Sequence, residues 1–150
     1  MFKLRITREI NASKEFIFDW WTDLSPDDSR LVKPLKSRKI ISKSPNLIVL
    51  EDEERMYFRR MKFSVRVSME RPNRWVSEYE GKTAHARSEY VLSSISKEVT
   101  RLHYTSEISP EGFFTNLFSP IIKLFVKRVF QGEFDVFIRA IESEYARKSC

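Results

Sequence analysis

The chain has 150 residues, of which 41% are hydrophobic, and its net charge is +6. This length and composition predict one folded domain over residues 1–150 and exclude a long disordered chain. Three scattered glycines and one cysteine, Cys150, exclude a glycine-rich phosphate loop, an intramolecular disulfide and a cysteine metal cluster. The first residues lack the apolar core of a signal peptide, and the longest apolar stretch contains basic residues, so we expect a cytoplasmic protein without a transmembrane segment.

The N-terminal part of the chain predicts one strand followed by two short helices. Apolar and polar residues alternate over residues 3–10, which is the period of a strand. Ser13 fits a helix N-cap, and the apolar residues after it recur at helical spacing, which predicts a helix over 14–21. Ser25 or Asp27 is placed to cap a second brief helical turn.

The middle of the chain predicts six strands joined by short turns. Apolar and polar residues alternate within each segment, and proline, glycine, asparagine and serine lie between the segments. Short connections indicate an antiparallel meander. The six segments cover residues 35–43, 46–53, 55–69, 74–80, 83–95 and 98–109.

The last third of the chain changes to the period of a helix. Ser119-Pro120 fits a helix start, and about 27 residues follow with one broad apolar face that includes Phe125. Gly132 lies within this helix and either permits a bend or a close approach or is only tolerated. A seven-stranded sheet must bury one face, and only this helix is large enough to cover it. We therefore predict an α+β helix-grip fold, in which a curved antiparallel sheet closes around the long C-terminal helix.

This arrangement predicts an apolar cavity between the sheet and the helix. Aromatic side chains with a polar tip suit the walls of such a cavity, because they offer both apolar surface and a hydrogen bond. Ser88 and Ser106 are small enough to leave room there, although twenty aromatic residues can also fill the space as a solid core. The candidate ligand-binding residues are Trp20, Tyr57, Trp75, Tyr79, Tyr90, Tyr104, Phe125, Val129, Phe130 and Phe134.

The sequence carries no catalytic constellation that we can assign. The alternation places His85 and His103 on the outer face, and no motif indicates a metal or a cofactor. Glu78 would be a candidate acid or base if it pointed inward. We favour the register that turns Trp75, Ser77 and Tyr79 inward instead, and we expect binding rather than catalysis.

Residues 30–43 contain six basic side chains and no acidic one. One interpretation is a docking site for an anionic partner such as RNA, the ribosome or an anionic membrane. The other is an outward strand face whose charges are balanced by the acidic run 51–54 on the next strand. The basic residues are Arg30, Lys33, Lys36, Arg38, Lys39 and Lys43.

The order of these elements resembles the START-like superfamily, also called the Bet v 1-like or SRPBCC helix-grip fold. Residues 12–19 (ASKEFIFD) resemble the start of its polyketide cyclase/dehydrase-like members. Phe114, Leu117, residues 120–122 and the stretch from Phe134 to Glu144 resemble their closing helix. The resemblance implies a cavity for a hydrophobic or amphipathic small molecule, such as a lipid, a quinone or a polyketide-like compound. It implies as an alternative a cyclase- or aromatase-like enzyme that uses a cavity tyrosine or glutamate as acid or base. For the oligomeric state, both a monomer and a dimer stay open.

Overall fold

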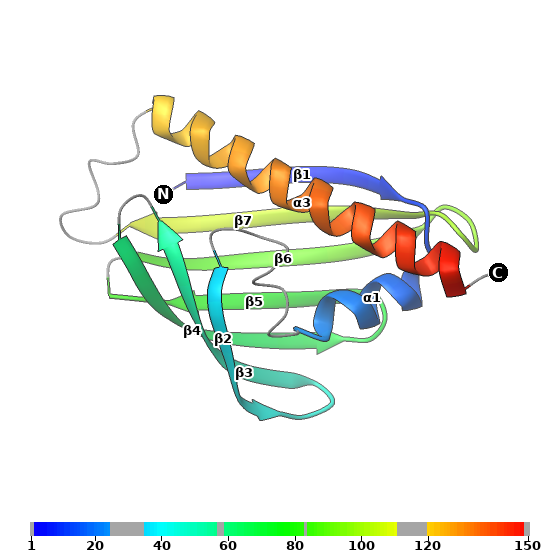
Figure 1. Ribbon diagram of the computed structural model, residues 1–150, viewed down its shortest axis with the longest axis horizontal. Helices are drawn as coiled ribbons and strands as arrows, with labels where there is room; N and C mark the ends of the chain where they lie inside the picture. The colour runs from blue at the N-terminus through cyan, green and yellow to red at the C-terminus, as the bar shows by residue number, and fades with distance from the viewer. Residues whose placement is uncertain (1, 25–34, 57–58, 83, 111–119, 149–150) are drawn as a thin grey trace.

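The computed structural model describes residues 2–24, 35–56, 59–82, 84–110 and 120–148 (Figure 1). These residues form a seven-stranded sheet, one short helix and one long helix, as the sequence predicts. The second short helix expected after Ser25 lies outside the described residues. The elements are β1 (Phe2–Ile10), α1 (Lys14–Thr22), β2 (Leu35–Lys43), β3 (Leu47–Met56), β4 (Arg59–Glu70), β5 (Arg74–Glu80), β6 (Ala84–Ser94), β7 (Thr100–Pro110) and α3 (Pro120–Lys148).

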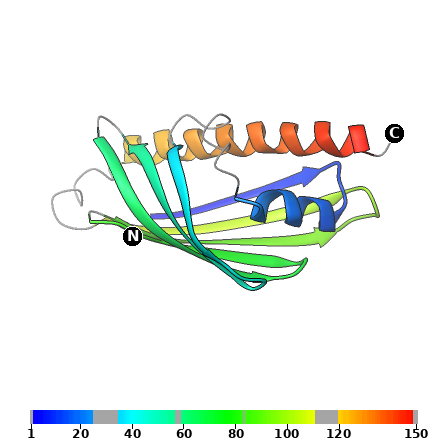
Figure 2. The same ribbon diagram turned by 60° about the horizontal axis from the view of Figure 1, so that its bottom comes forward.

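The sheet has the strand order β1-β7-β6-β5-β4-β3-β2, and every neighbouring pair is antiparallel. Strands β2 to β7 therefore form the predicted meander, and β1 is added beside β7. The sheet is curved, and α1 and α3 both lie over its inner side, with β2, β3 and β4 bending up towards α3 (Figure 2). We call this inner side the concave face.

The boundary between the third and fourth strands differs from the sequence prediction. We expected the third strand to end near residue 53 and the fourth to begin at residue 55, but β3 continues to Met56 and β4 begins at Arg59. The acidic run in β3 has partners on both sides, because Glu53 lies opposite Ser37 in β2 and opposite Lys62 in β4. Opposite charges on adjacent strands stabilise the pairing, so the strand continues past residue 53.

The start of α1 is fixed by two side-chain hydrogen bonds. Ser13 is the N-cap, as predicted, and its Oγ accepts a hydrogen bond from the backbone N–H of Phe16 at 3.2 Å. The buried hydroxyl of Thr100 in β7 donates to the carbonyl oxygen of Ala12 at 2.8 Å. These bonds hold α1 against the concave face, where Ile17, Phe18 and Trp21 are buried.

Helix α3 is packed against the sheet mainly through its C-terminal two-thirds. Phe134, Ile138 and Ile141 are buried there. We expected Phe125 on the same apolar face, but it is 59% exposed, so that part of the prediction is wrong. A Cβ atom added at Gly132 would meet nothing within 4 Å, so no close approach requires this glycine. None of the helices in the described ranges is long and apolar enough to cross a membrane.

Candidate functional site between the sheet and α3

Three buried serines form a row across the middle of the concave face. Ser77 in β5 lies opposite Ser88 in β6, which in turn lies opposite Ser106 in β7. The row continues into apolar side chains at both ends, to Val67 in β4 and Leu4 in β1. Serine is much smaller than the aliphatic residues that fill sheet interiors. This row therefore fills less of the space between the sheet and α3, and it adds polar groups to the concave face.

The next row along the same strands is aromatic. Trp75, Tyr90 and Tyr104 lie opposite one another on β5, β6 and β7. The rings of Trp75 and Tyr90 are stacked with centroids 4.7 Å apart, and Tyr104 lies 4.7 Å from Phe134 of α3. Trp21 of α1 contacts this group from the side, 5.7 Å from Tyr90. Aromatic rings therefore fill the space between the sheet and the helices on this side of the serine row.

Hydrogen bonds connect the two rows. Ser88 Oγ lies 3.1 Å from the Tyr104 hydroxyl and 3.0 Å from Ser106 Oγ. In a hydrophobic interior these hydroxyls require such partners, because an unpaired buried polar group costs about 1–3 kcal/mol. The three side chains therefore form one satisfied polar cluster, which we call the hydroxyl cluster.

Two other hydroxyls on this face behave differently. Ser77 is 4% exposed and Tyr90 is 9% exposed, yet neither hydroxyl takes part in a side-chain hydrogen bond within the described ranges. No fully enclosed side-chain nitrogen or oxygen among the described residues lacks a partner. The Ser77 and Tyr90 hydroxyls therefore keep a small accessible surface.

A buried ion pair lies further along the concave face. Arg38 in β2 and Asp52 in β3 lie opposite each other, with Nε 2.8 Å from Oδ1 and Nη2 3.0 Å from Oδ2. Their side chains are only 10% and 1% exposed. This pair was not predicted from the sequence, although the alternation of Ile48 and Leu50 with more exposed residues continues to Asp52 and places it on the inner face. The pair adds a fixed polar group to an otherwise apolar wall.

The pKa of Tyr90, a titrating group of this face, is clearly shifted. Burial raises the pKa of Tyr90 well above its usual value, and nearby Tyr104, Tyr79 and the Glu133 carboxylate of α3 add to the effect. The positive charge of Arg38 acts in the opposite direction. The Tyr90 hydroxyl therefore stays protonated at neutral pH, so it is a hydrogen-bond donor and not a base.

The structure brings several of the expected ligand-binding residues together. Trp75, Tyr90, Tyr104 and Phe134 form the buried aromatic group, and Trp20, Tyr79, Val129 and Phe130 are half-buried. Phe125 is exposed and lies away from this group, and Tyr57 lies outside the described residues. Ser77 and the Arg38–Asp52 pair were not among the expected binding residues.

The remaining residues that we considered for catalysis, Glu78, His85 and His103, lie on the outer face of the sheet. Glu78 is exposed and lies opposite Arg66 and Arg87, so the favoured register is confirmed and Glu78 points away from the interior. His85 and His103 are exposed as well, as predicted. Within the described ranges, no group of His, Cys, Asp and Glu side chains is arranged to hold a metal ion.

The acidic run 51–54 lies opposite the basic segment, as the second interpretation of that segment predicts, but Arg38 and Asp52 are buried on the inner face and not on the expected outward face. Arg38 is paired with Asp52, and Lys39 lies opposite Glu51. Lys39 and Lys43 are exposed. Arg30 and Lys33 lie outside the described residues, and the side chain of Lys36 is not described.

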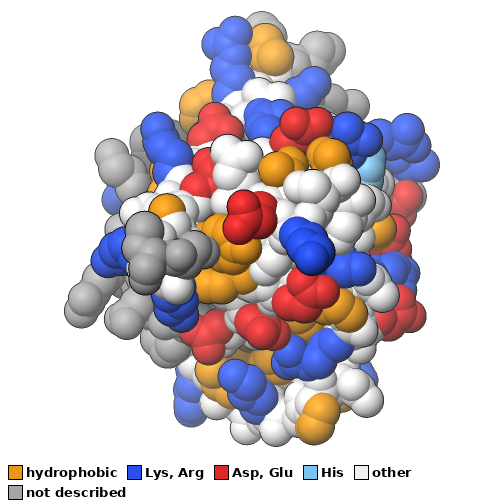
Figure 3. All heavy atoms as spheres, turned by 90° about the vertical axis from the view of Figure 1, so that its right-hand side faces the viewer, with side chains coloured by type: hydrophobic (Ala, Val, Ile, Leu, Met, Phe, Trp, Pro, Cys, Tyr) orange, Lys and Arg blue, Asp and Glu red, His pale blue; other side chains and the backbone are white. Residues whose placement is uncertain are grey.

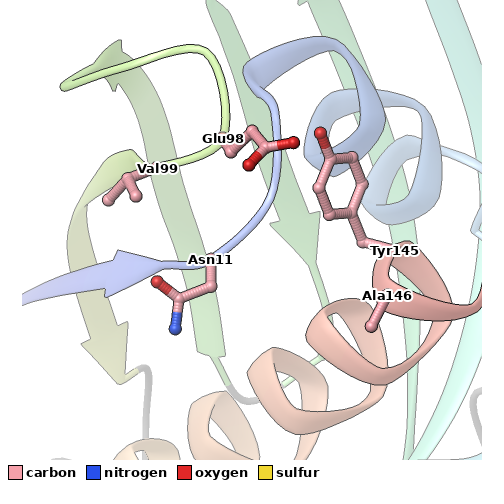
Figure 4. A pocket seen from close by; sticks show the side chains of 5 residues that line it. All are labelled: Asn11, Glu98, Val99, Tyr145 and Ala146. Carbon is pink, nitrogen blue, oxygen red and sulfur yellow. The ribbon is translucent and has the colours of Figure 1, made fainter. Parts of the chain in front are cut away.

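A separate pocket of about 310 Å³ lies on the outside of the molecule, near the C-terminal end of α3. Asn11, Glu98, Val99, Tyr145 and Ala146 line it (Figure 4). Asn11, Glu98 and Ala146 are exposed, and the space-filling view of this end of the molecule shows acidic and basic side chains side by side (Figure 3). This pocket does not connect the residues of the concave face described above.

A scan against protein-family models found no match, and a search of curated proteins found none either. Solved structures are similar over almost the whole chain. A protein from Thermus thermophilus has 14% sequence identity and a TM-score of 0.81, with 95% of this chain and 98% of that chain covered. The Zhui aromatase/cyclase from a Streptomyces species has 11% identity and a TM-score of 0.76, covering 99% and 95%.

A START superfamily protein from Mycobacterium smegmatis has 14% identity and a TM-score of 0.70, with 98% of this chain and 99% of that chain covered. Identities this low establish the fold and leave the activity open. The strand order, the curved sheet and the long C-terminal helix agree with these likenesses. The chain therefore has the START-like helix-grip fold, also called the Bet v 1-like or SRPBCC fold.

Proposed function

We propose that this protein binds a hydrophobic or amphipathic small molecule between the concave face and α3. The observation that carries the proposal is that Ser77 and Tyr90, residues about nine-tenths or more buried, have hydroxyls that make no side-chain hydrogen bond within the described ranges. These hydroxyls keep a small accessible surface. A ligand with a polar group would hydrogen-bond to them and be oriented by them.

The surroundings of these two hydroxyls suit such a ligand. Val65 and Val67 in β4 and Leu4 in β1 supply aliphatic surface beside the serine row. Trp75 and Tyr104 supply aromatic surface next to Tyr90. Ligand sites are typically apolar with a few polar groups that fix orientation. Lipids, quinones and polyketide-like molecules with a single carbonyl or hydroxyl group all meet this description.

The enzymatic alternative, a cyclase or aromatase, has less support. One structural neighbour is an aromatase/cyclase, but similar folds host unrelated functions. Glu78, the carboxylate that we considered as an acid or base, is on the outer face. The raised pKa of Tyr90 suits donation of a hydrogen bond to a carbonyl oxygen and not proton abstraction. We therefore place binding ahead of catalysis.

The proposal is tested by native mass spectrometry with three probes: dodecanoic acid, 2-naphthol and a short-chain ubiquinone. We expect at least one of them to bind, and Tyr90→Phe to weaken its binding by about threefold to tenfold, the value of one hydrogen bond. Tyr145→Phe is the matched control, because Tyr145 lines the outer pocket. Equal effects of the two substitutions would contradict the proposed site.

Ser77→Leu distinguishes a hollow interior from a solid one. If space lies beside the Ser77 hydroxyl, leucine occupies it, the fold is retained and probe binding is lost. If aromatic rings fill the whole interior, the larger side chain overpacks the core and lowers the free energy of unfolding by about 1–3 kcal/mol. The second result, in a protein that binds none of the three probes, would contradict the proposal.

A further inference from the structure

The first turns of α3 carry exposed apolar side chains beside exposed basic ones. Leu124 and Phe125 are 52% and 59% exposed, and Lys127 and Arg128 are exposed as well. Residues three and four apart lie on the same face of a helix. Leu124 is therefore next to both basic residues, and Phe125 is next to Arg128. We call these four residues the α3 patch.

The charge of the α3 patch is not balanced by its surroundings. Within the described ranges, no ion pair involves Lys127 or Arg128. The sequence has no aspartate or glutamate between Pro120 and Gly132. The N-terminal end of a helix also carries positive potential from the backbone dipoles. This end of α3 therefore attracts an anionic partner.

Several basic residues of the sheet are paired instead. Lys3 pairs with Glu107, Arg74 pairs with Glu89, and Arg101 pairs with Glu9. The end of the molecule around the α3 C-terminus mixes acidic and basic side chains (Figure 3). Exposed lysine also lies beside exposed isoleucine at Lys39 and Ile40 of β2, but Lys39 is opposite Glu51, whereas the α3 patch has no acidic residue next to it in the helix. The α3 patch is also separated from the buried aromatic group, which packs against later turns of the helix.

We propose that the α3 patch docks this protein on an anionic lipid surface. The Leu124 and Phe125 side chains enter the boundary between headgroups and acyl chains, while Lys127 and Arg128 contact lipid phosphates. Exposed leucine and phenylalanine next to lysine and arginine are also found on helices that lie in a membrane interface. A nucleic acid would use the two charges but would leave the aliphatic Leu124 without a matching surface, so the observations favour lipid.

Vesicle co-sedimentation tests this proposal with two vesicle compositions: phosphatidylcholine mixed with phosphatidylglycerol, and phosphatidylcholine alone. We expect binding to the mixed vesicles and much weaker binding to the neutral ones. Leu124→Ser with Phe125→Ser should lower the partition coefficient by about tenfold. Lys127→Gln with Arg128→Gln should lower it by about fivefold for each charge removed. Ile95→Ser is the matched control, because Ile95 is 47% exposed in the connection between β6 and β7 and should leave binding unchanged.

Circular dichroism establishes whether each variant keeps the fold. We expect all of them to keep it, because the substituted residues are exposed. Equal binding of the wild-type protein to both vesicle types, or to neither, overturns the proposal. A different pattern also overturns it: loss of binding with the two glutamine substitutions and none with the two serine substitutions. That result, together with binding to polyuridylic acid, would assign the α3 patch to general polyanion or RNA contact.

Discussion

Ser88 Oγ lies 3.1 Å from the Tyr104 hydroxyl, and this hydrogen bond joins two adjacent strands inside the grip. The two residues are diagonal neighbours, since Ser88 is opposite Ser106 and Tyr104 is opposite Tyr90. Ser88 therefore holds the serine row and the aromatic row in one register. The hydroxyl cluster stabilises the concave face at the place where we propose that a ligand binds.

Ser88→Ala should lower the free energy of unfolding by about 1–2 kcal/mol, because it takes a partner from the Tyr104 hydroxyl and from Ser106 Oγ. Ser68→Ala is the matched control, since Ser68 is an exposed residue of β4. A change within about 0.5 kcal/mol is expected for it. Urea denaturation of both variants measures the difference, and equal stabilities would show that the cluster contributes nothing.

Tyr90 should make the protein less stable at alkaline pH. The pKa of Tyr90 in the folded state is raised above the unfolded value of about 10. The contribution of protonated Tyr90 to the free energy of unfolding is therefore fully present below about pH 10 and is lost as the pH rises through the folded-state pKa. In that window Tyr90 lowers the free energy of unfolding by up to about 1.4 kcal/mol per pH unit. Urea denaturation between about pH 8 and about pH 11 should show a shallower decline for Tyr90→Phe than for the wild-type protein. Identical declines would contradict the raised pKa.

Removing one partner of the Arg38–Asp52 pair should destabilise the protein much more than replacing both partners. Asp52→Leu leaves the Arg38 guanidinium buried without its carboxylate, which should lower the free energy of unfolding by about 3–5 kcal/mol. Replacing both residues, with Arg38→Met and Asp52→Leu together, should recover most of this loss because no buried charge remains. Thermal unfolding compares the two variants. A double variant as unstable as the single one would mean that the pair also determines the local structure.

Gly132→Ala should stabilise the protein. Gly132 lies inside α3, and an added methyl group meets nothing within 4 Å. Alanine loses less backbone entropy than glycine in a helix, so the free energy of unfolding should rise by about 1 kcal/mol. A decrease, measured by thermal unfolding, would indicate that α3 requires the glycine for a bend.

Much of the fold is readable from the sequence, because the period of two, the turn residues and the final helical period are local signals. The inward positions of Ser77, Ser88, Tyr90 and Tyr104 follow from alternation alone. The hydrogen bonds among Ser88, Ser106 and Tyr104 do not, since they depend on the register between strands, which turn residues and alternation do not specify to one residue.

The sequence was least informative where a local pattern has two structural meanings. We expected the third strand to end near residue 53, yet β3 continues to Met56, with Glu53 opposite Lys62 of the neighbouring strand. Phe125 has the spacing of the buried face of α3, yet it is exposed because the packed contacts begin later in the helix. In both cases the outcome depends on neighbours that are distant in sequence.

The central claim is that an amphipathic molecule binds between the concave face and α3, and amide chemical-shift mapping tests it most directly. The ¹⁵N-labelled protein is titrated with dodecanoic acid, 2-naphthol and a short-chain ubiquinone. We predict saturable shifts at Ser77, Ser88, Tyr90 and Ser106 with at least one probe, and none at Asn11, Glu98 and Ala146 of the outer pocket. Shifts confined to the outer pocket, or no shift at the concave face with any of the three probes, would contradict the claim.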